Sequence, residues 1–318
     1  MRVVFFGTPE LAVPTLAAVA DRHEVAAVVC QPDQPKGRSG TPAPPPVKEY
    51  ALAHGLTVHQ PAKLNDGTFE EWLRGIAPEI GVVAAYGRLL KQPILDLFPL
   101  GLMNVHPSLL PKYRGPSPIQ SAVLAGEEVT GVSIMRISLE MDAGDVLLQE
   151  QVPIDPNENA GDLTMRLAQS GATMMLKALD QAAAGQANFS PQDPAAVSHC
   201  RMFEKRHGAI CWECPAKTIH DQVRASLPWP VAYCLLEGQT VRIHKTRVAQ
   251  EDGSGADPKL PGTIVALGNE GIRVATGQGM LDIVQLQIPG KKVLGAEEFL
   301  RGRKLTVGQR FEGATNAS

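Results

Sequence analysis

Short runs of apolar residues alternate with amphipathic segments along the first two thirds of the chain. Residues 2–6 and 24–30 show the continuous apolar pattern of buried strands, and apolar residues recur at helical spacing between them. A further buried strand is expected at residues 79–85. Strands that alternate with helices in this way predict a doubly wound, mostly parallel sheet in a Rossmann-like α/β fold.

The same patterns predict the other elements of this part. Thr8 is expected to cap the first helix, with Pro9 and Glu10 in its first turn. Residues 31–46, rich in proline and glycine, are expected to form a loop without regular structure. Residues 130–137 alternate like a strand buried on one face only. Further helices are expected at residues 47–54, 69–74, 93–98, 119–125 and 161–184, and strands at 57–60, 103–105 and 146–154.

The last third changes character. A helix is expected at residues 216–226, followed by short strands with glycine-rich turns between them. These strands are expected at residues 232–236, 240–248, 262–267, 271–275 and 280–286. Such a series indicates a small OB-like β-barrel. The domains are therefore expected to be an α/β domain at 1–188, a linker at 189–206 and the barrel domain at 207–318.

Composition narrows the class of protein. Of the 318 residues, 44% are hydrophobic and 20% charged, as in soluble globular proteins. The sequence has no apolar run long enough for a membrane span and no signal-peptide pattern, and its five cysteines do not make a disulfide framework. We therefore expect a cytoplasmic protein.

Charge is distributed unevenly. Residues 1–205 hold 16 Lys and Arg against 22 Asp and Glu, whereas residues 206–318 hold 14 against 11. The two balances, −6 and +3, give the net charge of −3. This asymmetry permits an anionic partner on the C-terminal part, although a mixed solvated surface gives the same count.

Candidate chemistry lies at the end of the strand predicted near residue 104. Asn104 and His106 are two residues apart, so on an extended strand their side chains point to the same face. At the carboxyl end of a strand, where α/β proteins bind ligands, an amide can stabilise an oxyanion and an imidazole can move a proton. Such a pair in a loop is often only a turn asparagine and a surface histidine.

An acidic turn at residues 140–145 supplies a third group. Asp142 could orient the imidazole of His106 or take a proton from it, although Asp and Gly are also ordinary turn residues. Together the three side chains suit attack on a carbonyl without a covalent enzyme intermediate. The sequence Gly7-Thr8-Pro9-Glu10 lacks the glycine spacing of a dinucleotide site, which argues against such a cofactor.

At these positions the chain resembles a known family, the methionyl-tRNA formyltransferases. The resemblance rests on Asn104-Val-His106-Pro-Ser-Leu-Leu-Pro-Lys-Tyr-Arg-Gly115, Pro118-Ile119-Gln120 and Asp142-Ala-Gly-Asp145. It extends over nearly the whole chain through Gly7-Thr8-Pro9-Glu10, Gln31-Pro32-Asp33, Ala85-Tyr86-Gly87, residues 224–230 and Gly290-Lys291-Lys292. The Asn-x-His and Asp set is shared by all 10-formyltetrahydrofolate-dependent N-formyltransferases.

The resemblance implies a reaction and a set of site residues. Formyl would pass from 10-formyltetrahydrofolate to the α-amine of initiator methionyl-tRNA by direct attack of the amine, with no metal or obligate protein partner. Asn104 and His106 would stabilise the oxyanion, and Asp142 would hold His106 and assist proton transfer. Arg38 would contact the tRNA acceptor end, and the barrel would contact the tRNA backbone. The folate contacts implied are Ser108, Leu109, Leu110, Pro111, Tyr86, Gly87, Leu89 and Leu90.

The chain departs from the family pattern in places. Lys91 stands where a proline is common, Ser-Gly-Thr follows Arg38 where relatives often have lysines, and the linker residues 199–214 match poorly. Two alternatives stay open: a formyltransferase for glycinamide ribonucleotide or an amino sugar, and a nonenzymatic RNA-binding protein built on the barrel.

Two cysteines near the start of the last third have the Cys-x-x-Cys spacing that zinc sites use. Zinc ligation by Cys200, His207, Cys211 and Cys214 is not expected, because only one Cys-x-x-Cys pair is present and the other spacings are irregular.

Overall fold

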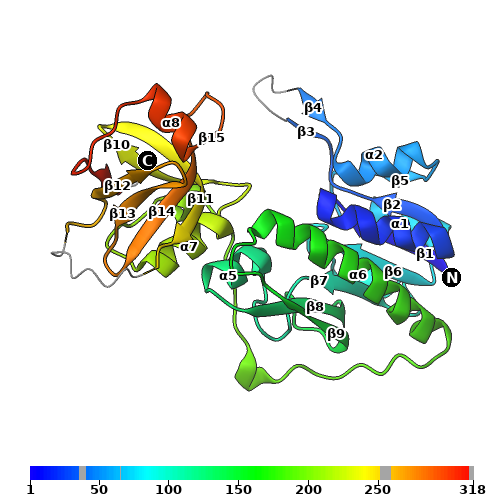
Figure 1. Ribbon diagram of the computed structural model, residues 1–318. Coiled ribbons are helices and arrows are strands. Elements are labelled where there is room, and N and C mark those ends of the chain that lie inside the picture. The colour runs from blue at the N-terminus through cyan, green and yellow to red at the C-terminus, as the bar shows by residue number, and fades with distance from the viewer. Residues whose placement is uncertain (36–40, 65, 251–258, 315–318) are drawn as a thin grey trace. The chain divides into compact units, whose positions relative to one another are not determined.

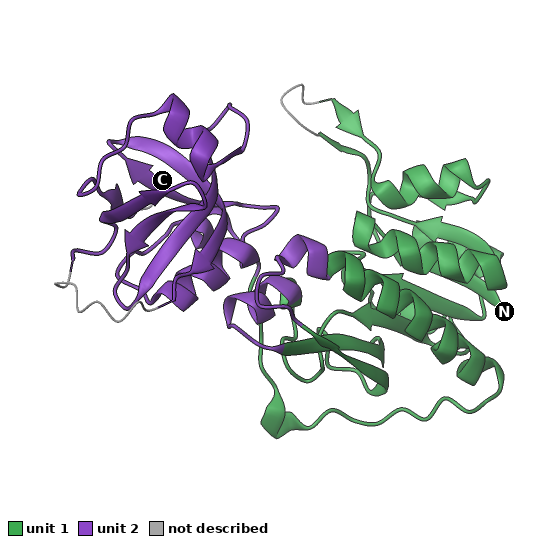
Figure 2. Ribbon diagram, in the orientation of Figure 1, with its two compact units in different colours: residues 1–118, 129–153, 164–201 green, residues 119–128, 154–163, 202–318 purple. Residues whose placement is uncertain are grey.

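A computed structural model describes the chain except for residues 36–40, 65, 251–258 and 315–318. It divides into two compact units, shown in Figure 2. Unit 1 comprises residues 1–118, 129–153 and 164–201, and unit 2 comprises residues 119–128, 154–163 and 202–318. In the described part of the chain, no helix is both long and apolar enough to span a bilayer.

Unit 1 contains a seven-stranded sheet in the order β5-β2-β1-β6-β7-β8-β9 (Figure 1). The first five strands in this order are parallel, and β8 and β9 are antiparallel to their neighbours. The strands are β1 (Arg2–Gly7), β2 (Glu24–Val29), β5 (Val58–His59), β6 (Ile80–Ala84), β7 (Leu102–His106), β8 (Val129–Arg136) and β9 (Val146–Pro153). The predicted doubly wound, mostly parallel sheet is confirmed.

Helices cover both faces of this sheet, because successive strand residues point to opposite sides. Val4 and Phe6 of β1 pack with Phe69 and Ile94 from the helices of one face. On the other face α6 approaches closely at Gly171, where an added Cβ would lie 2.6 Å from Val105. The helices described in the first two thirds of the chain are η1 (Glu10–Ala12), α1 (Val13–Arg22), α2 (Pro46–Ala53), α3 (Thr68–Ile76), α4 (Gln92–Leu95), α5 (Pro118–Leu124), α6 (Ala160–Ala183), η2 (Pro194–Ala196) and η3 (Lys205–Gly208).

Two local predictions in unit 1 were wrong. Thr8 does not cap the first helix; its hydroxyl donates instead to the carbonyl oxygen of Tyr86, 3.2 Å away. The segment 31–46 is not wholly irregular, because β3 (Gln34–Pro35) and β4 (Pro42–Ala43) pair as a short antiparallel ribbon.

Strand β8 was predicted to be buried on one face only, and this was also wrong. Residues 130–135 are buried on both faces. The second face is covered by the loop after β7, whose Leu109 lies so close to Gly131 that an added Cβ would be 2.5 Å away. Alternation along a strand cannot reveal such a cover when it comes from a distant segment.

Unit 2 is built on an antiparallel sheet in the order β12-β13-β14-β11-β10-β16, with β15 paired to β14. The sheet curls into a half-barrel, and the bridge between Thr263 and Arg310 joins its two ends. This confirms the predicted OB-like domain. Its elements are α7 (Ala216–Ala225), β10 (Ala232–Leu236), β11 (Gln239–Val248), β12 (Ile264–Gly268), β13 (Gly271–Ala275), β14 (Met280–Gln287), β15 (Leu294–Gly295), α8 (Ala296–Gly302) and β16 (Phe311–Glu312).

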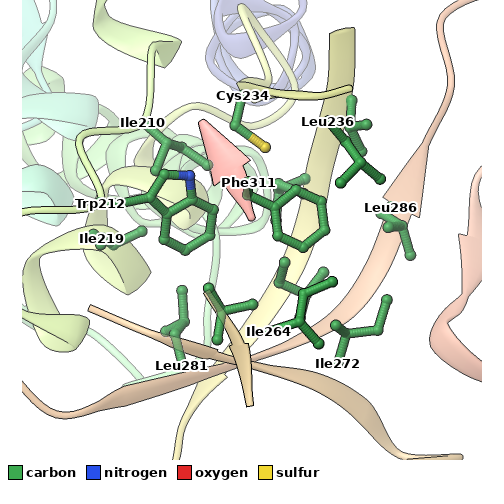
Figure 3. Packing of buried hydrophobic residues seen from close by; sticks show 14 of the residues in the cluster. Ile210, Trp212, Ile219, Cys234, Leu236, Ile264, Ile272, Leu281, Leu286 and Phe311 are labelled. Atoms are coloured by element: carbon green, nitrogen blue, oxygen red, sulfur yellow. The ribbon is translucent and has the colours of Figure 1, made fainter. Parts of the chain in front are cut away.

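The core of unit 2 lies inside this curl. Figure 3 shows Trp212 and Phe311 among aliphatic side chains from the surrounding strands, and their ring centroids are 5.8 Å apart. The sequence analysis missed β15, β16 and α8. Elements this short show no periodic pattern, so only pairing with strands already in place defines them.

Candidate active site

The carboxyl end of β7 brings the predicted Asn-x-His pair to the edge of the sheet. His106 is the last residue of β7, and β6, its parallel neighbour, ends two residues before Tyr86. Asn104 and His106 therefore share one face of β7, as predicted from their spacing. Asn104 is half-buried, and among the described residues its amide has no hydrogen-bond partner, so it is available to a ligand.

His106 is 4% exposed, and both of its ring nitrogens face oxygen atoms. Nε2 lies 3.1 Å from the carbonyl oxygen of Tyr113, and Nδ1 lies 3.7 Å from Oδ1 of Asp142. Burial lowers the pKa of His106, while the Asp142 charge and the contact with Tyr113 oppose this. Since a carbonyl oxygen only accepts, the neutral ring carries its hydrogen on Nε2, which leaves the Nδ1 lone pair facing Asp142.

Asp142 lies in the turn between β8 and β9 and adopts a left-handed backbone conformation, with φ of 53°. The backbone N–H of Gly115 donates to Asp142 Oδ2 over 2.8 Å, which leaves Oδ1 toward His106. The carboxylate thus has one fixed oxygen and one oxygen near the imidazole. The structure brings this pair together, as the sequence analysis anticipated.

The predicted folate segment, residues 108–111, is held by buried polar contacts. Ser108 is fully buried, and its hydroxyl donates to the carbonyl oxygen of Lys112 over 2.6 Å. Ser133 of β8 donates to the Ser108 carbonyl oxygen and accepts from the Leu110 N–H. The Gln149 amide donates to the Leu110 carbonyl oxygen over 2.7 Å.

These contacts leave the Ser108 hydroxyl to shape the loop rather than to meet a ligand. Sequence reasoning missed Ser133 and Gln149. The register of β8 against β7, in which Ser133 pairs with His106, is the signal that identifies Ser133.

The second predicted folate segment, residues 86–90, follows β6. Tyr86 is buried, its hydroxyl has no partner among the described residues, and burial raises its pKa to about 12. Gly87 has a φ of 76°, and an added Cβ there would lie 2.6 Å from the Gln31 amide. Leu90 is buried, whereas Leu89 is 63% exposed. Leu89 is therefore the apolar side chain of this segment that solvent or a ligand can reach.

Arg38 lies outside the described residues. Beside β3, Lys48 Nζ lies 2.8 Å from both carboxylate oxygens of Asp33 and from the Gln60 side-chain oxygen. Hydrogen bonds from Lys48 and Gln60 lower the pKa of Asp33. This network, which sequence reasoning missed, fixes Asp33 just before β3.

Two further observations bear on ligands. Within the described ranges, no group of three or more His, Cys, Asp or Glu side chains could hold a metal ion. A hollow of about 380 Å³, lined by residues such as Phe98, Arg136 and Phe189, lies near the amino end of β7. None of the predicted site residues lines it. The candidate site is therefore defined by its converging polar groups.

Comparison with known proteins gives the class. The family model for formyl transferase matches residues 1–179, and the model for the formyl transferase C-terminal domain matches residues 202–304. The fold agrees with an N-formyltransferase from Helicobacter canadensis in complex with folinic acid and dTDP-3-aminofucose. That match has a TM-score of 0.67 at 20% identity and covers 89% of this chain and 98% of the other. The class is thus an enzyme of the formyltransferase type.

Sequence relatives identify the family within this class of enzyme. The chain is 44% identical over 310 residues to the methionyl-tRNA formyltransferase of Moorella thermoacetica, covering 97% of this chain and 98% of that protein. It is 43% identical over 313 residues to the methionyl-tRNA formyltransferase of Pelobacter propionicus, covering 98% and 96% respectively. The chain belongs to the methionyl-tRNA formyltransferase family.

Proposed function

We propose that this enzyme transfers the formyl group of 10-formyltetrahydrofolate to the free α-amine of initiator methionyl-tRNA in the cytoplasm. The observation that carries the proposal is the convergence of Asn104, His106 and Asp142 at the carboxyl end of β7. The names of the relatives support the substrate. In the proposed arrangement residues 1–188 hold the chemistry, 189–206 form the linker and 207–318 contact the tRNA.

The first step is attack of the amine on the formyl carbon, which places negative charge on the formyl oxygen. Asn104 stabilises this oxyanion, because its amide N–H groups are not used by the described residues. Loss of one such donor from a preorganised site typically raises the barrier by about 2.7–4 kcal/mol.

The second step is removal of a proton from the attacking nitrogen. The neutral His106 ring has its only lone pair on Nδ1, so Nδ1 accepts the proton directly or through a water. The imidazolium that forms faces the Asp142 carboxylate at 3.7 Å, which stabilises its charge. The proton then passes to the N10 nitrogen as tetrahydrofolate leaves.

Folate and tRNA meet different parts of the chain in this proposal. The segments 108–111 and 86–90 line the folate site, with Leu109 and Leu89 as apolar contacts. A structure with tetrahydrofolic acid bound, that of HypX from Aquifex aeolicus, has the same fold by a TM-score of 0.64 at 20% identity, covering 94% of this chain and 47% of that one. Arg38 contacts the acceptor end, and the net positive charge of residues 206–318 suits the tRNA backbone.

The test is formyl transfer in vitro with three acceptors offered separately: charged initiator tRNA, glycinamide ribonucleotide and a nucleotide-linked amino sugar. Formylation of the tRNA alone is expected. Transfer to either small acceptor with higher kcat/KM would replace this proposal with the small-substrate alternative. Binding of tRNA without transfer to any acceptor would favour the nonenzymatic alternative.

A further inference from the structure

Both polar atoms of the Gln192 side-chain amide make hydrogen bonds next to Asp142. The side chain is half-buried, and its Nε2 donates to the carbonyl oxygens of Asp142 over 2.8 Å and of Gly144 over 2.7 Å. Its Oε1 accepts from Nε of Arg114 over 3.0 Å. A glutamine with both amide hydrogens on backbone carbonyls fixes those carbonyls relative to each other.

The turn that Gln192 holds has an uncommon backbone conformation and lies close to β8. Asp142 has a positive φ of 53°, a left-handed conformation that is uncommon for residues other than glycine. Gly144 presses against β8 so closely that an added Cβ would lie 1.8 Å from the Arg136 carbonyl oxygen. Such a conformation persists only where the surroundings determine it. The Gln192 amide is one of those determinants, since it satisfies the carbonyls of both residues.

Arg114 connects the same amide to the Asp142 carboxylate by a second route. Arg114 is 8% exposed, and the next residue, Gly115, supplies the N–H that holds Asp142 Oδ2. The backbone of Arg114 is itself paired with residues 198–200: its N–H donates to the Ser198 carbonyl oxygen, and its carbonyl accepts from the Cys200 N–H. Gln192 therefore contacts both the backbone of Asp142 and the strand-like segment that holds its carboxylate.

We infer that Gln192 is a positioning residue, which fixes the Asp142 carboxylate relative to His106 through the acidic turn and through Arg114. The catalytic importance of this role rests on the proposed function, but the placement itself does not. Residues 190–200 thereby acquire a role in the geometry of the site.

The position of the Asp142 carboxylate affects the pKa of His106. Asp142 is the charged side chain that raises the pKa of His106 against the lowering by burial, and the Tyr113 carbonyl adds to this. Charged groups in or beside the turn also include Asp145, Arg114 and Glu140, and the closest atoms of Arg114 and Glu140 are 3.5 Å apart. Because Coulomb energy falls with distance, movement of the Asp142 carboxylate away from His106 lowers the pKa of His106.

The decisive measurement is an NMR titration of the His106 ring in the full-length protein, with the resonance assigned by its loss in His106→Asn. In Gln192→Met, which keeps the length of the side chain but cannot donate, the His106 pKa is expected to fall by about 0.5 unit or more. Gln222→Met is the matched control. Gln222 also donates to two backbone carbonyls, those of His207 and Ala209, and is also half-buried, but it lies in unit 2.

Kinetics give a second readout. With saturating substrates, Gln192→Met is expected to lower kcat by about tenfold or more while each KM changes less than twofold, because only the placement of a catalytic group is altered. An unchanged His106 titration in a folded Gln192→Met protein, or an equal shift in Gln222→Met, overturns the inference. If Gln192→Met does not fold, Gln192→Asn, which keeps the amide on a shorter stem, must shift the titration in the same direction.

The NMR titration does not depend on catalytic turnover. An unshifted titration can therefore be distinguished from a failure of the proposed function. Absence of formyl transfer by the wild-type enzyme would refute the proposed function and leave the Gln192 titration to be decided on its own. An unshifted titration with normal wild-type transfer would refute only the role of Gln192.

Discussion

Nδ1 of His106 lies 3.7 Å from Oδ1 of Asp142, although His106 ends a central strand and Asp142 lies in a turn beyond the next one. The separation is too long for a hydrogen bond but short enough for a strong charge interaction in a buried site. Burial and this carboxylate act on the His106 pKa in opposite directions, with burial the larger influence. The pair therefore rests as a neutral imidazole beside a carboxylate, which suits acceptance of a proton.

Asn104→Ala and His106→Ala are each expected to lower kcat by at least about 100-fold while the protein stays folded, because each removes a group aimed at the reacting atoms. Steady-state kinetics at saturating tRNA and folate donor measure this. Asn157→Ala, at an exposed asparagine, is the control and is expected to change nothing. Near-native kcat in either site variant would refute the assignment of that residue.

The pH dependence follows from the lowered pKa of His106. Its ordinary value is 6.5, so in the unfolded chain it binds a proton more readily than in the folded one. Stability from this group is complete above pH 6.5 and is lost as pH falls through 6.5 toward the folded pKa. His106→Asn is therefore expected to weaken the loss of thermal stability below pH 6.5. An identical pH dependence in wild type and variant would contradict the buried, neutral ring.

Removing the Asp142 charge gives a second pH test. Asp142→Asn is expected to move the His106 NMR titration to lower pH, because the carboxylate favours the protonated ring. Asp145→Asn, in the same acidic turn, is the comparison. A shift toward higher pH in Asp142→Asn would show that the carboxylate does not act on His106 as the geometry requires.

Gly115→Ala is expected to disturb the site through the backbone. Gly115 has a φ of 123°, and an added Cβ would lie 2.3 Å from the Cys200 carbonyl oxygen, so the N–H that holds Asp142 must move. We expect a loss of about 1–3 kcal/mol in unfolding free energy and a fall in kcat of about tenfold. Gly185→Ala, also at positive φ but with open space around it, should lose stability without losing kcat. Equal kcat for both variants would contradict the role of Gly115.

Arg38→Ala is expected to weaken recognition of tRNA and to leave folate affinity unchanged. Loss of a charged hydrogen bond to phosphate or a base edge typically raises KM for the tRNA about tenfold or more. The experiment titrates tRNA and folate donor independently for wild type and variant. Unchanged tRNA parameters would leave the loop without a role and favour the small-substrate alternative.

Cys211 and Cys214 are expected not to hold zinc, because the two residues that would complete a four-ligand set, Cys200 and His207, are irregularly spaced. Cys200 is buried, and His207 Nδ1 is engaged with the backbone of Glu204. Elemental analysis of protein purified without added metal should give far less than one zinc per chain. A stoichiometric zinc signal that disappears in Cys211→Ser would contradict this.

The local sequence pattern was sufficient to predict the elements whose residues interact mostly with their neighbours in sequence. Alternation along a strand put Asn104 and His106 on one face, and apolar runs located β1, β2 and β6 to within a residue or two at each end. The five barrel strands after α7 were also found, because turn residues punctuate them. These features depend on backbone geometry that repeats every two to four residues, so the order of residues alone determines them.

Tertiary structure decided what depends on segments far apart in the chain. The hydroxyl of Thr8 donates to Tyr86, both faces of β8 are covered, and Gln192 holds the turn that places Asp142 near His106. The burial that lowers the His106 pKa has the same origin. None of these contacts has a periodic signal in the sequence, because each forms only when strand pairing and packing bring the two segments within a few ångströms of each other.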